Sequence, residues 1–141
     1  MPVFNDVTDT TAWQLAHQLN LRVDLFLLSP DFRSHYTSSD RLADAARSAP
    51  RHIAEGFASD RRAFADRLRT ARVSQAQVLM HLSEAYDQRL ITLDELQIAD
   101  SLTRRAMRAA NGLIRALEAT NDAATTARRR SRRPTRPAPT D

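Results

Sequence analysis

Apolar residues recur at three- and four-residue steps along most of the chain, the spacing that places them on one face of an α-helix. Four such segments predict helices over residues 9–28, 39–55, 59–89 and 93–120. No segment shows the strict alternation of a β-strand. The third and fourth segments are joined by a very short connection, which favours an antiparallel hairpin. We therefore predict an all-α fold, an antiparallel up-down four-helix bundle over residues 1–120.

Short polar motifs mark the predicted helix starts. In a capping box, the N-cap hydroxyl accepts a hydrogen bond from the backbone N–H three residues later, and the side chain of that later residue accepts one from the N-cap backbone N–H. Thr11 with Gln14 fits this pattern at the first helix, and Thr92 with Glu95 fits it at the fourth. Ser59 is the predicted N-cap of the third helix, because Ser is among the preferred residues there.

The first predicted helix carries more apolar side chains than one bundle core can cover. They lie around most of its circumference: Leu15, Leu19, Leu21, Val23, Leu25, Phe26, Leu27 and Leu28. A helix in a monomeric bundle needs an apolar stripe on one side only. The excess predicts an interface between copies of this chain, and a single wide core is the alternative.

Basic residues are concentrated at the C-terminal end. Residues 128–141 hold 6 Arg and 1 acidic residue, whereas residues 1–127 hold 15 Arg and 16 acidic residues. Three Pro and the lack of large apolar side chains predict a disordered Arg/Pro-rich tail over residues 121–141. Its arginines are candidates for salt-dependent contacts with RNA phosphates, and a merely solubilising end is the alternative. These candidates are Arg128, Arg129, Arg130, Arg132, Arg133 and Arg136.

Composition excludes several classes of protein. The chain has no Cys, which excludes disulfides and thiolate metal sites. Its longest purely apolar run is Leu25 to Leu28, far shorter than the roughly 20 residues of a membrane span. The N-terminus lacks the basic and apolar regions of a signal peptide. We therefore expect a cytoplasmic protein that needs no cofactor and contacts no membrane.

Two candidate chemistries follow from His and Ser spacing, and neither is favoured. His52 with Glu55 and His81 with Glu84 are similar to the Glu-x-x-His pairs of di-metal bundle oxidases. Their order is reversed, however, and both Glu side chains are expected to point away from the apolar faces. Ser48 and His52 form an i, i+4 pair, but no oxyanion hole accompanies them. We predict no catalytic residue, no metal site and no enzyme activity.

A string in the second predicted helix resembles a known family. Residues 45–57 read Ala-Ala-Arg-Ser-Ala-Pro-Arg-His-Ile-Ala-Glu-Gly-Phe. The signature of the 23S rRNA-intervening-sequence proteins reads roughly Ala-Ala-x-Ser-Ile-Pro-x-Asn-Ile-Ala-Glu-Gly-Tyr. Trp13-Gln14-x-Ala16 and the Phe64–Ser74 segment follow in the family's order, so the resemblance covers about residues 4–118. The family-signature corner comprises Ser48, Pro50, His52, Ile53, Glu55 and Gly56.

Structural roles are expected for most of this corner, and partner binding is the alternative. Gly56 is a natural C-terminal stop for the second helix. Glu55 is placed to accept backbone N–H groups at the start of the third helix, where negative charge is favourable. Pro50 removes a backbone donor and should kink the helix. Ser48 is expected to bond a backbone carbonyl near that kink.

The resemblance implies a four-helix bundle that forms a ring-like homo-oligomer, with five subunits expected. The family is also similar to the accessory variability proteins of diversity-generating retroelements, basic pentameric barrels that bind a reverse transcriptase and nucleic acid. This chain departs from the pattern at Ala43-Asp44, where two Arg are common, and at His52, where Asn is common. The departures weaken the basic surface of the second helix, and the Arg tail can compensate.

The sequence therefore predicts a non-enzymatic, homo-oligomeric helical adaptor that associates with RNA or a ribonucleoprotein. The main alternative is an accessory subunit of a protein such as a reverse transcriptase, with no direct role in binding nucleic acid. A di-metal oxidase is the remote alternative.

Overall fold

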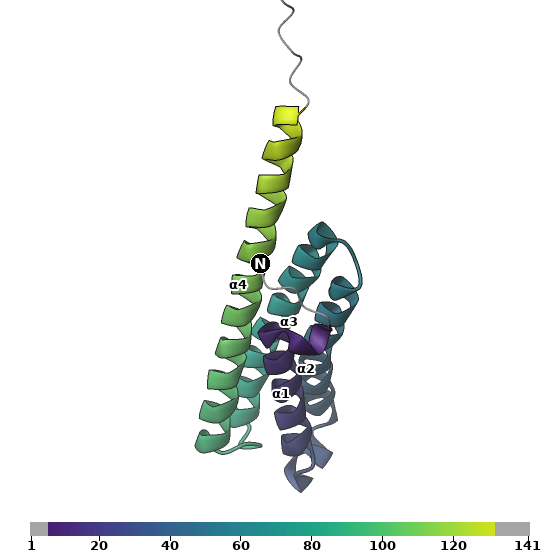
Figure 1. The fold of residues 1–141 in the computed structure, drawn as a ribbon. Coiled ribbons are helices and arrows are strands. Elements are labelled where there is room, and N and C mark those ends of the chain that lie inside the picture. Colours follow the sequence, from purple (N-terminus) through teal and green to yellow (C-terminus); the bar gives the residue numbers. More distant parts are fainter. Residues whose placement is uncertain (1–5, 132–141) are drawn as a thin grey trace, which may run out of the picture.

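Helices make up the whole regular structure of residues 6–131, the part of the chain that the computed structural model describes. The elements are η1 (Val7–Asp9), α1 (Thr11–Leu27), η2 (Pro30–Ser34), α2 (Tyr36–Phe57), α3 (Arg61–Asp87) and α4 (Leu93–Ser131) (Figure 1). Residues 6–131 contain no strand, so the predicted all-α class is confirmed. Within the same residues, no helix has the length and apolarity that crossing a membrane requires.

The four long helices form an up-down bundle. α2 packs against α3, α3 packs against α4, and α1 packs against both α2 and α4. α1 and α3 therefore face each other diagonally across the bundle, as Figure 1 shows. The predicted antiparallel bundle is confirmed.

The core divides into two clusters along the bundle axis. The turn-end core lies near the α3–α4 turn and includes Leu19, Val23, Phe26, Phe32, Leu42, Val78, Leu82, Leu90 and Ile91. The corner-end core lies near the α2–α3 corner and includes Ala16, Ile53, Phe64, Leu68, Ile114 and Leu117. Gln75 follows the corner-end residues of α3 and precedes its turn-end residues, and it is fully buried.

Helix α1 begins with a cap one residue earlier than predicted. Thr10 is the N-cap, and its Oγ1 accepts a hydrogen bond from the Trp13 backbone N–H at 3.2 Å. Gln14 donates its side-chain amide to the Thr8 carbonyl at 2.8 Å. The predicted Thr11–Gln14 box is therefore wrong, because the neighbouring Thr10 takes the cap.

The N-cap of α3 lies one residue later than predicted, whereas the capping box of α4 is as predicted. Asp60, not Ser59, caps α3, and its carboxylate accepts the Ala63 N–H at 2.9 Å. The Ser59 hydroxyl donates instead to the Glu55 carbonyl at 3.0 Å. At α4, the Thr92 hydroxyl accepts the Glu95 N–H at 3.1 Å and the Glu95 carboxylate accepts the Thr92 N–H at 2.9 Å. This second capping box is confirmed.

Helix α2 is longer than predicted at both ends. It starts at Tyr36 and runs without interruption through the buried Pro50 to Phe57. Gly56 therefore lies inside the last turn and has no positive φ angle, so its predicted role as a helix stop is wrong. A Cβ at Gly56 would lie 2.8 Å from the Arg67 Cβ and 2.9 Å from the Phe64 Cδ2. The glycine is needed for the close approach of α2 and α3.

Helix α4 continues past the predicted boundary at residue 120, through Ser131. In Figure 1 its C-terminal part extends beyond the rest of the bundle. The prediction of disorder is therefore wrong for residues 121–131, and residues 132–141 lie outside the described residues. No Gly or Pro occurs between Gly112 and Pro134, and adding residues to an existing helix avoids the cost of nucleation. Arginines in the last turn also complement the negative end of the helix dipole.

Candidate functional site

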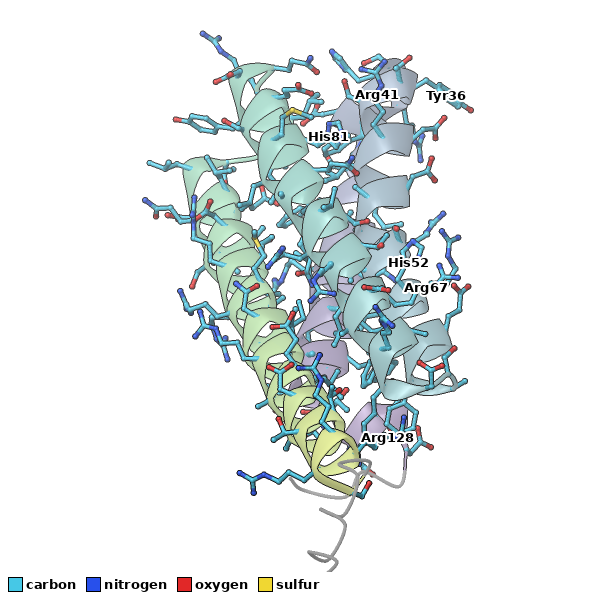
Figure 2. The ribbon with its side chains drawn as sticks, turned by 90° about the horizontal axis from the view of Figure 1, so that it is seen from above. Tyr36, Arg41, His52, Arg67, His81 and Arg128 are labelled. Carbon is cyan, nitrogen blue, oxygen red and sulfur yellow. The ribbon has the colours of Figure 1, made fainter. Side chains whose placement is uncertain are left out.

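The family-signature corner joins α2 to α3 through a three-residue polar cluster. Arg67 Nη1 lies 3.0 Å from His52 Nδ1 and 3.3 Å from Glu55 Oε2. Figure 2 shows His52 and Arg67 side by side on the two helices. Glu55 therefore pairs with a side chain of α3, and the prediction that it accepts backbone N–H groups at the start of α3 is wrong.

The contacts of His52 favour its neutral form. Arg67 can only donate, so His52 Nδ1 must accept and Nε2 must carry the single ring proton. Burial lowers the pKa of His52 below 6.5, and the positive charge of Arg67 lowers it further, whereas Glu55 raises it. The cluster is thus built around an uncharged imidazole, which is of no use as a cationic phosphate contact.

Ser48 also contacts α3 rather than its own helix. Its hydroxyl lies 2.9 Å from the Ser74 hydroxyl, and Ser74 in turn donates to the Thr70 carbonyl at 3.3 Å. The expected bond from Ser48 to a carbonyl near Pro50 is therefore wrong. The hydroxyl pair fixes the register between the two helices instead, and Ile53 lies fully buried in the corner-end core.

The two His–Glu pairs do not assemble into a larger ligand set. His81 Nδ1 lies 3.4 Å from Glu84 Oε2, and His52 Nδ1 lies 3.9 Å from Glu55 Oε2. Each pair stays within one helix. Across residues 6–131, no three His, Asp or Glu side chains come together as a possible metal-binding group. The arrangement offers nothing to support the di-metal alternative.

Three of the predicted RNA-contacting arginines lie on the projecting end of α4. Arg128, Arg129 and Arg130 form its last turn and are exposed. Because successive helical residues point about 100° apart, they spread around the helix instead of forming one face. The other three candidates, Arg132, Arg133 and Arg136, lie outside the described residues.

Exposed apolar side chains gather at the opposite end of the bundle. On α1, Leu21 is 50% exposed, Leu25 is 59% exposed and Leu28 is 75% exposed. Their spacing of four and three residues places them on one stripe. Other exposed large apolar side chains lie on α2, α3 and α4 at Tyr36, Met80, Tyr86, Leu93 and Ile98. Figure 2 places Tyr36 and Arg128 at opposite ends of the molecule. The end of the bundle that carries the α1 leucine stripe, called the apolar end below, therefore lies opposite the C-terminal arginines of α4, although Arg41 of α2 lies beside Tyr36 at the same end (Figure 2).

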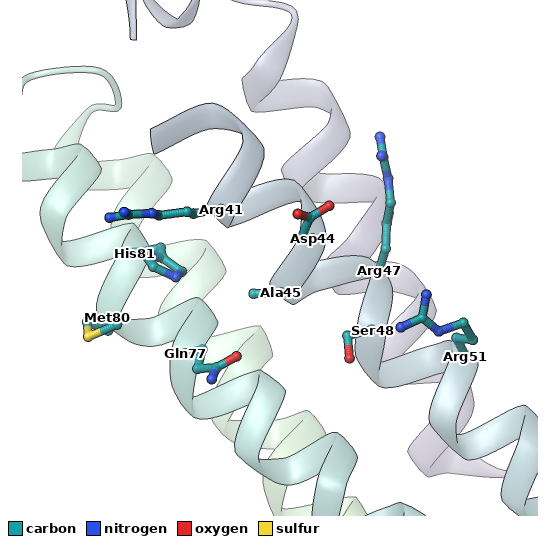
Figure 3. Close-up of a pocket in the computed structure, with 9 residues that line it drawn as sticks. All are labelled: Arg41, Asp44, Ala45, Arg47, Ser48, Arg51, Gln77, Met80 and His81. Carbon is teal, nitrogen blue, oxygen red and sulfur yellow. The ribbon is translucent and has the colours of Figure 1, made fainter. Parts of the chain in front are cut away.

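A basic groove between α2 and α3 was missed by the sequence analysis. It encloses about 950 Å³, and Arg41, Arg47 and Arg51 line its α2 side while Gln77 and His81 line its α3 side. In Figure 3, Arg41 extends toward His81, and Arg51 turns toward Ser48. The signal in the sequence was the recurrence of Arg on the polar side of the second helix. Only the packing of α3 beside that face turns these arginines into a groove.

Comparison with known proteins identifies the family. The family model described as 23S rRNA-intervening sequence protein matches residues 8–112, which cover most of the bundle. No curated protein and no solved structure matches this chain. The resemblance carried by residues 45–57 is therefore confirmed over α1, α2, α3 and the first half of α4. The chain belongs to the 23S rRNA-intervening sequence protein family.

Proposed function

We propose that this protein is a non-enzymatic adaptor that assembles with itself through its apolar end and associates with RNA through its basic residues. The observation that carries the proposal is the concentration of exposed apolar side chains around the turn-end core. A small helical bundle has no structural need for three exposed leucines in one stripe. Such patches are typical of surfaces that bind another protein.

A second copy of the chain is the occupant that best fits the apolar end. The stripe of Leu21 and Leu25 on α1 and Leu28 at its C-cap is exposed and aliphatic, as expected for a helix that packs on another helix. Exposed apolar residues also lie on α3 and α4, so one protomer presents more than one contact surface. Contacts between different surfaces of neighbouring copies close into rings when the rotation permits. Five subunits remain the expected number.

Self-assembly is tested by light scattering on the purified protein at micromolar concentration. The protomer has a mass of 15.9 kDa, and we expect a multiple of that mass, about fivefold, for a ring. The triple variant Leu21→Gln/Leu25→Gln/Leu28→Gln should shift the mass toward the protomer. Val73→Gln is the matched control, because Val73 is 57% exposed and lies outside the stripe. A wild-type monomer, or an unchanged mass in the triple variant, would contradict the assembly.

RNA association rests on the arginines at the other end of the molecule. The exposed Arg128, Arg129 and Arg130 are separated from the apolar end by the length of the bundle, so assembly leaves them accessible. Each arginine that neutralises an RNA phosphate contributes about 0.7 to the slope of log affinity against log salt. Anisotropy of a labelled single-stranded RNA should therefore show tight binding at low salt. Affinity that does not depend on salt would count against this role.

A protein partner, for example a reverse transcriptase, remains the second candidate because apolar surface also suits a protein. It predicts that the partner is retained after residues 128–141 are removed. The RNA-binding adaptor predicts that the same truncation removes most of the salt-dependent RNA binding.

A further inference from the structure

The groove between α2 and α3 collects three arginines, and the fold gives only one of them, Arg47, an acidic partner. Within residues 6–131, Arg41 and Arg51 make no ion pair, and Arg47 makes only a 3.7 Å contact with Asp24. The neighbouring arginines of α3 are used differently. Arg67 pairs with Glu55, and Arg69 pairs with both Asp66 and Glu118. The groove arginines therefore keep their charge available for a ligand.

The charge in this groove is predominantly positive. Three arginines line it together with one acidic side chain, Asp44. The neutral polar groups of Ser48 and Gln77 add hydrogen-bonding capacity on the two walls. A concave surface between protein walls of low dielectric concentrates such a field more than a convex surface does. Arginine is also the side chain best matched to phosphate, because its planar fork donates two parallel hydrogen bonds.

The spacing of the arginines fits an extended ligand. At 1.5 Å rise per residue, Arg41 and Arg51 lie about 15 Å apart along the axis of α2, with Arg47 between them. A stacked nucleic-acid strand carries one phosphate per about 3.4 Å of axis, so about four nucleotides span the same length. Apart from the single imidazole of His81, the groove has no aromatic ring on which bases could stack. Its geometry therefore favours contact with the backbone and not with the bases.

We propose that this groove is a second RNA contact, in which Arg41, Arg47 and Arg51 bind phosphates of one strand independently of sequence. This inference deepens the proposed function and rests on its RNA-binding half. It gives the bundle a basic surface even though Asp44 lies among the arginines of the groove. The contact uses α2 and α3 only, so it persists when the arginines at the end of α4 are neutralised.

The test uses the full-length chain with all six C-terminal arginines changed to Gln, so that only the bundle contributes. In this background, anisotropy of a labelled oligouridylate is measured over a series of NaCl concentrations. Arg41→Gln/Arg47→Gln/Arg51→Gln should lower the affinity at low salt by about tenfold or more. It should also reduce the salt slope by about two, at about 0.7 per lost contact.

The matched control removes the same charge from α4, by Arg105→Gln/Arg108→Gln/Arg115→Gln. These arginines are exposed and have no ion pair within residues 6–131. The groove proposal requires a clearly smaller loss in this control. Equal losses in the two triple variants would show general attraction to charge and would overturn the groove as a site. Circular dichroism confirms that each variant keeps its helices.

Two further outcomes separate this inference from the proposed function. If the wild type binds RNA but the background variant does not, the C-terminal arginines carry all binding and only the groove proposal fails. If the wild type binds no RNA, both fail. Displacement of the RNA by millimolar inorganic phosphate, at constant ionic strength, would assign the groove to a single phosphate and overturn the extended strand.

Discussion

The two glycines of this chain should respond to the same substitution with opposite signs. Gly56 lies where α2 approaches α3, and an added Cβ would meet the Arg67 Cβ at 2.8 Å and the Phe64 Cδ2 at 2.9 Å. Both distances are too short for real carbon contacts. Gly112 lies on the exposed side of α4, and an added Cβ there would meet nothing within 4 Å. Comparing the Gly→Ala substitution at the two positions therefore separates the effect of helix propensity from the effect of steric fit.

The magnitudes follow from these two environments. Ala is preferred over Gly inside a helix by about 0.8–1 kcal/mol, so Gly112→Ala should raise the free energy of unfolding by about that amount. Gly56→Ala gains the same preference but overfills a packed contact, which costs about 1–3 kcal/mol. The contacting atoms are a Cβ and a ring carbon, which cannot move away without shifting a helix or a buried ring. We therefore place the steric cost near its upper limit and expect a net loss of about 1–2 kcal/mol.

Urea denaturation followed by circular dichroism measures both effects. All variants must be compared at one protomer concentration, because the stability of an assembling protein depends on that concentration. The expected result is a higher midpoint for Gly112→Ala and a lower midpoint for Gly56→Ala than for the wild type. If Gly56→Ala is stabilised as much as Gly112→Ala, the close approach of α2 and α3 does not exist as described.

Two further predictions concern the polar contacts between α2 and α3. The pKa of His52 is lowered in the folded state, so on acidification the unfolded chain takes up a proton before the folded chain does. Stability should therefore fall as the pH drops below about 6.5. His52→Asn keeps a hydrogen-bond acceptor for Arg67 and should reduce this loss of stability. Urea midpoints measured at about pH 7.5 and pH 5.5 would reveal the difference between the variant and the wild type. An identical loss of stability in the variant would exclude His52 as its source. The Ser48–Ser74 hydroxyl pair should give a coupling energy of about 0.5–1.5 kcal/mol in a double-mutant cycle with Ala, whereas zero coupling would mean that the 2.9 Å contact contributes nothing.

The helices were predictable because each has a continuous apolar stripe, whereas their first residues were harder to assign. Thr10 and Thr11 are adjacent, and so are Ser59 and Asp60, and all four residues are of types that serve well as N-caps. Sequence preference cannot decide between two good neighbours. The choice depends on which side chain reaches the free N–H three residues later, as Thr10 and Asp60 do. Thr92 has no such competitor beside it, and its box was predicted correctly.

The end of α4 was mispredicted for a different reason. The loss of the apolar pattern after Leu117 indicates that nothing packs on this segment, and the interpretation as disorder rested on that loss and on three Pro that all lie beyond residue 131. Most of the segment is nonetheless compatible with helix, and α4 already supplies the preceding turns. Extending a helix needs no tertiary partner when each new residue adds one backbone hydrogen bond. Burial and helicity are separate properties here, and the sequence pattern reports only the first.

The hydrogen-bond and ion-pair partners of the candidate site residues could not be predicted from the sequence. Ser48 was expected to bond within its own helix, and it bonds Ser74 on α3. Glu55 was expected to accept backbone N–H groups at the start of α3, and it pairs with the Arg67 side chain. Periodicity gives the face of a helix on which a residue lies. It does not give the rotation and axial shift of the next helix, which decide the partner. The groove at Arg41 depends on the same unknowns.

These contacts explain the family signature in physical terms. Ser48 bonds α3, Ile53 fills the corner-end core, Glu55 pairs with Arg67, and Gly56 leaves room for α3 to approach. Each of these residues meets the same neighbouring helix, so the signature is a description of how α2 packs on α3. It constrains the shape of the bundle without specifying a ligand. Any ligand specificity of this protein must then come from residues outside the signature, and the groove arginines Arg41, Arg47 and Arg51 are such residues.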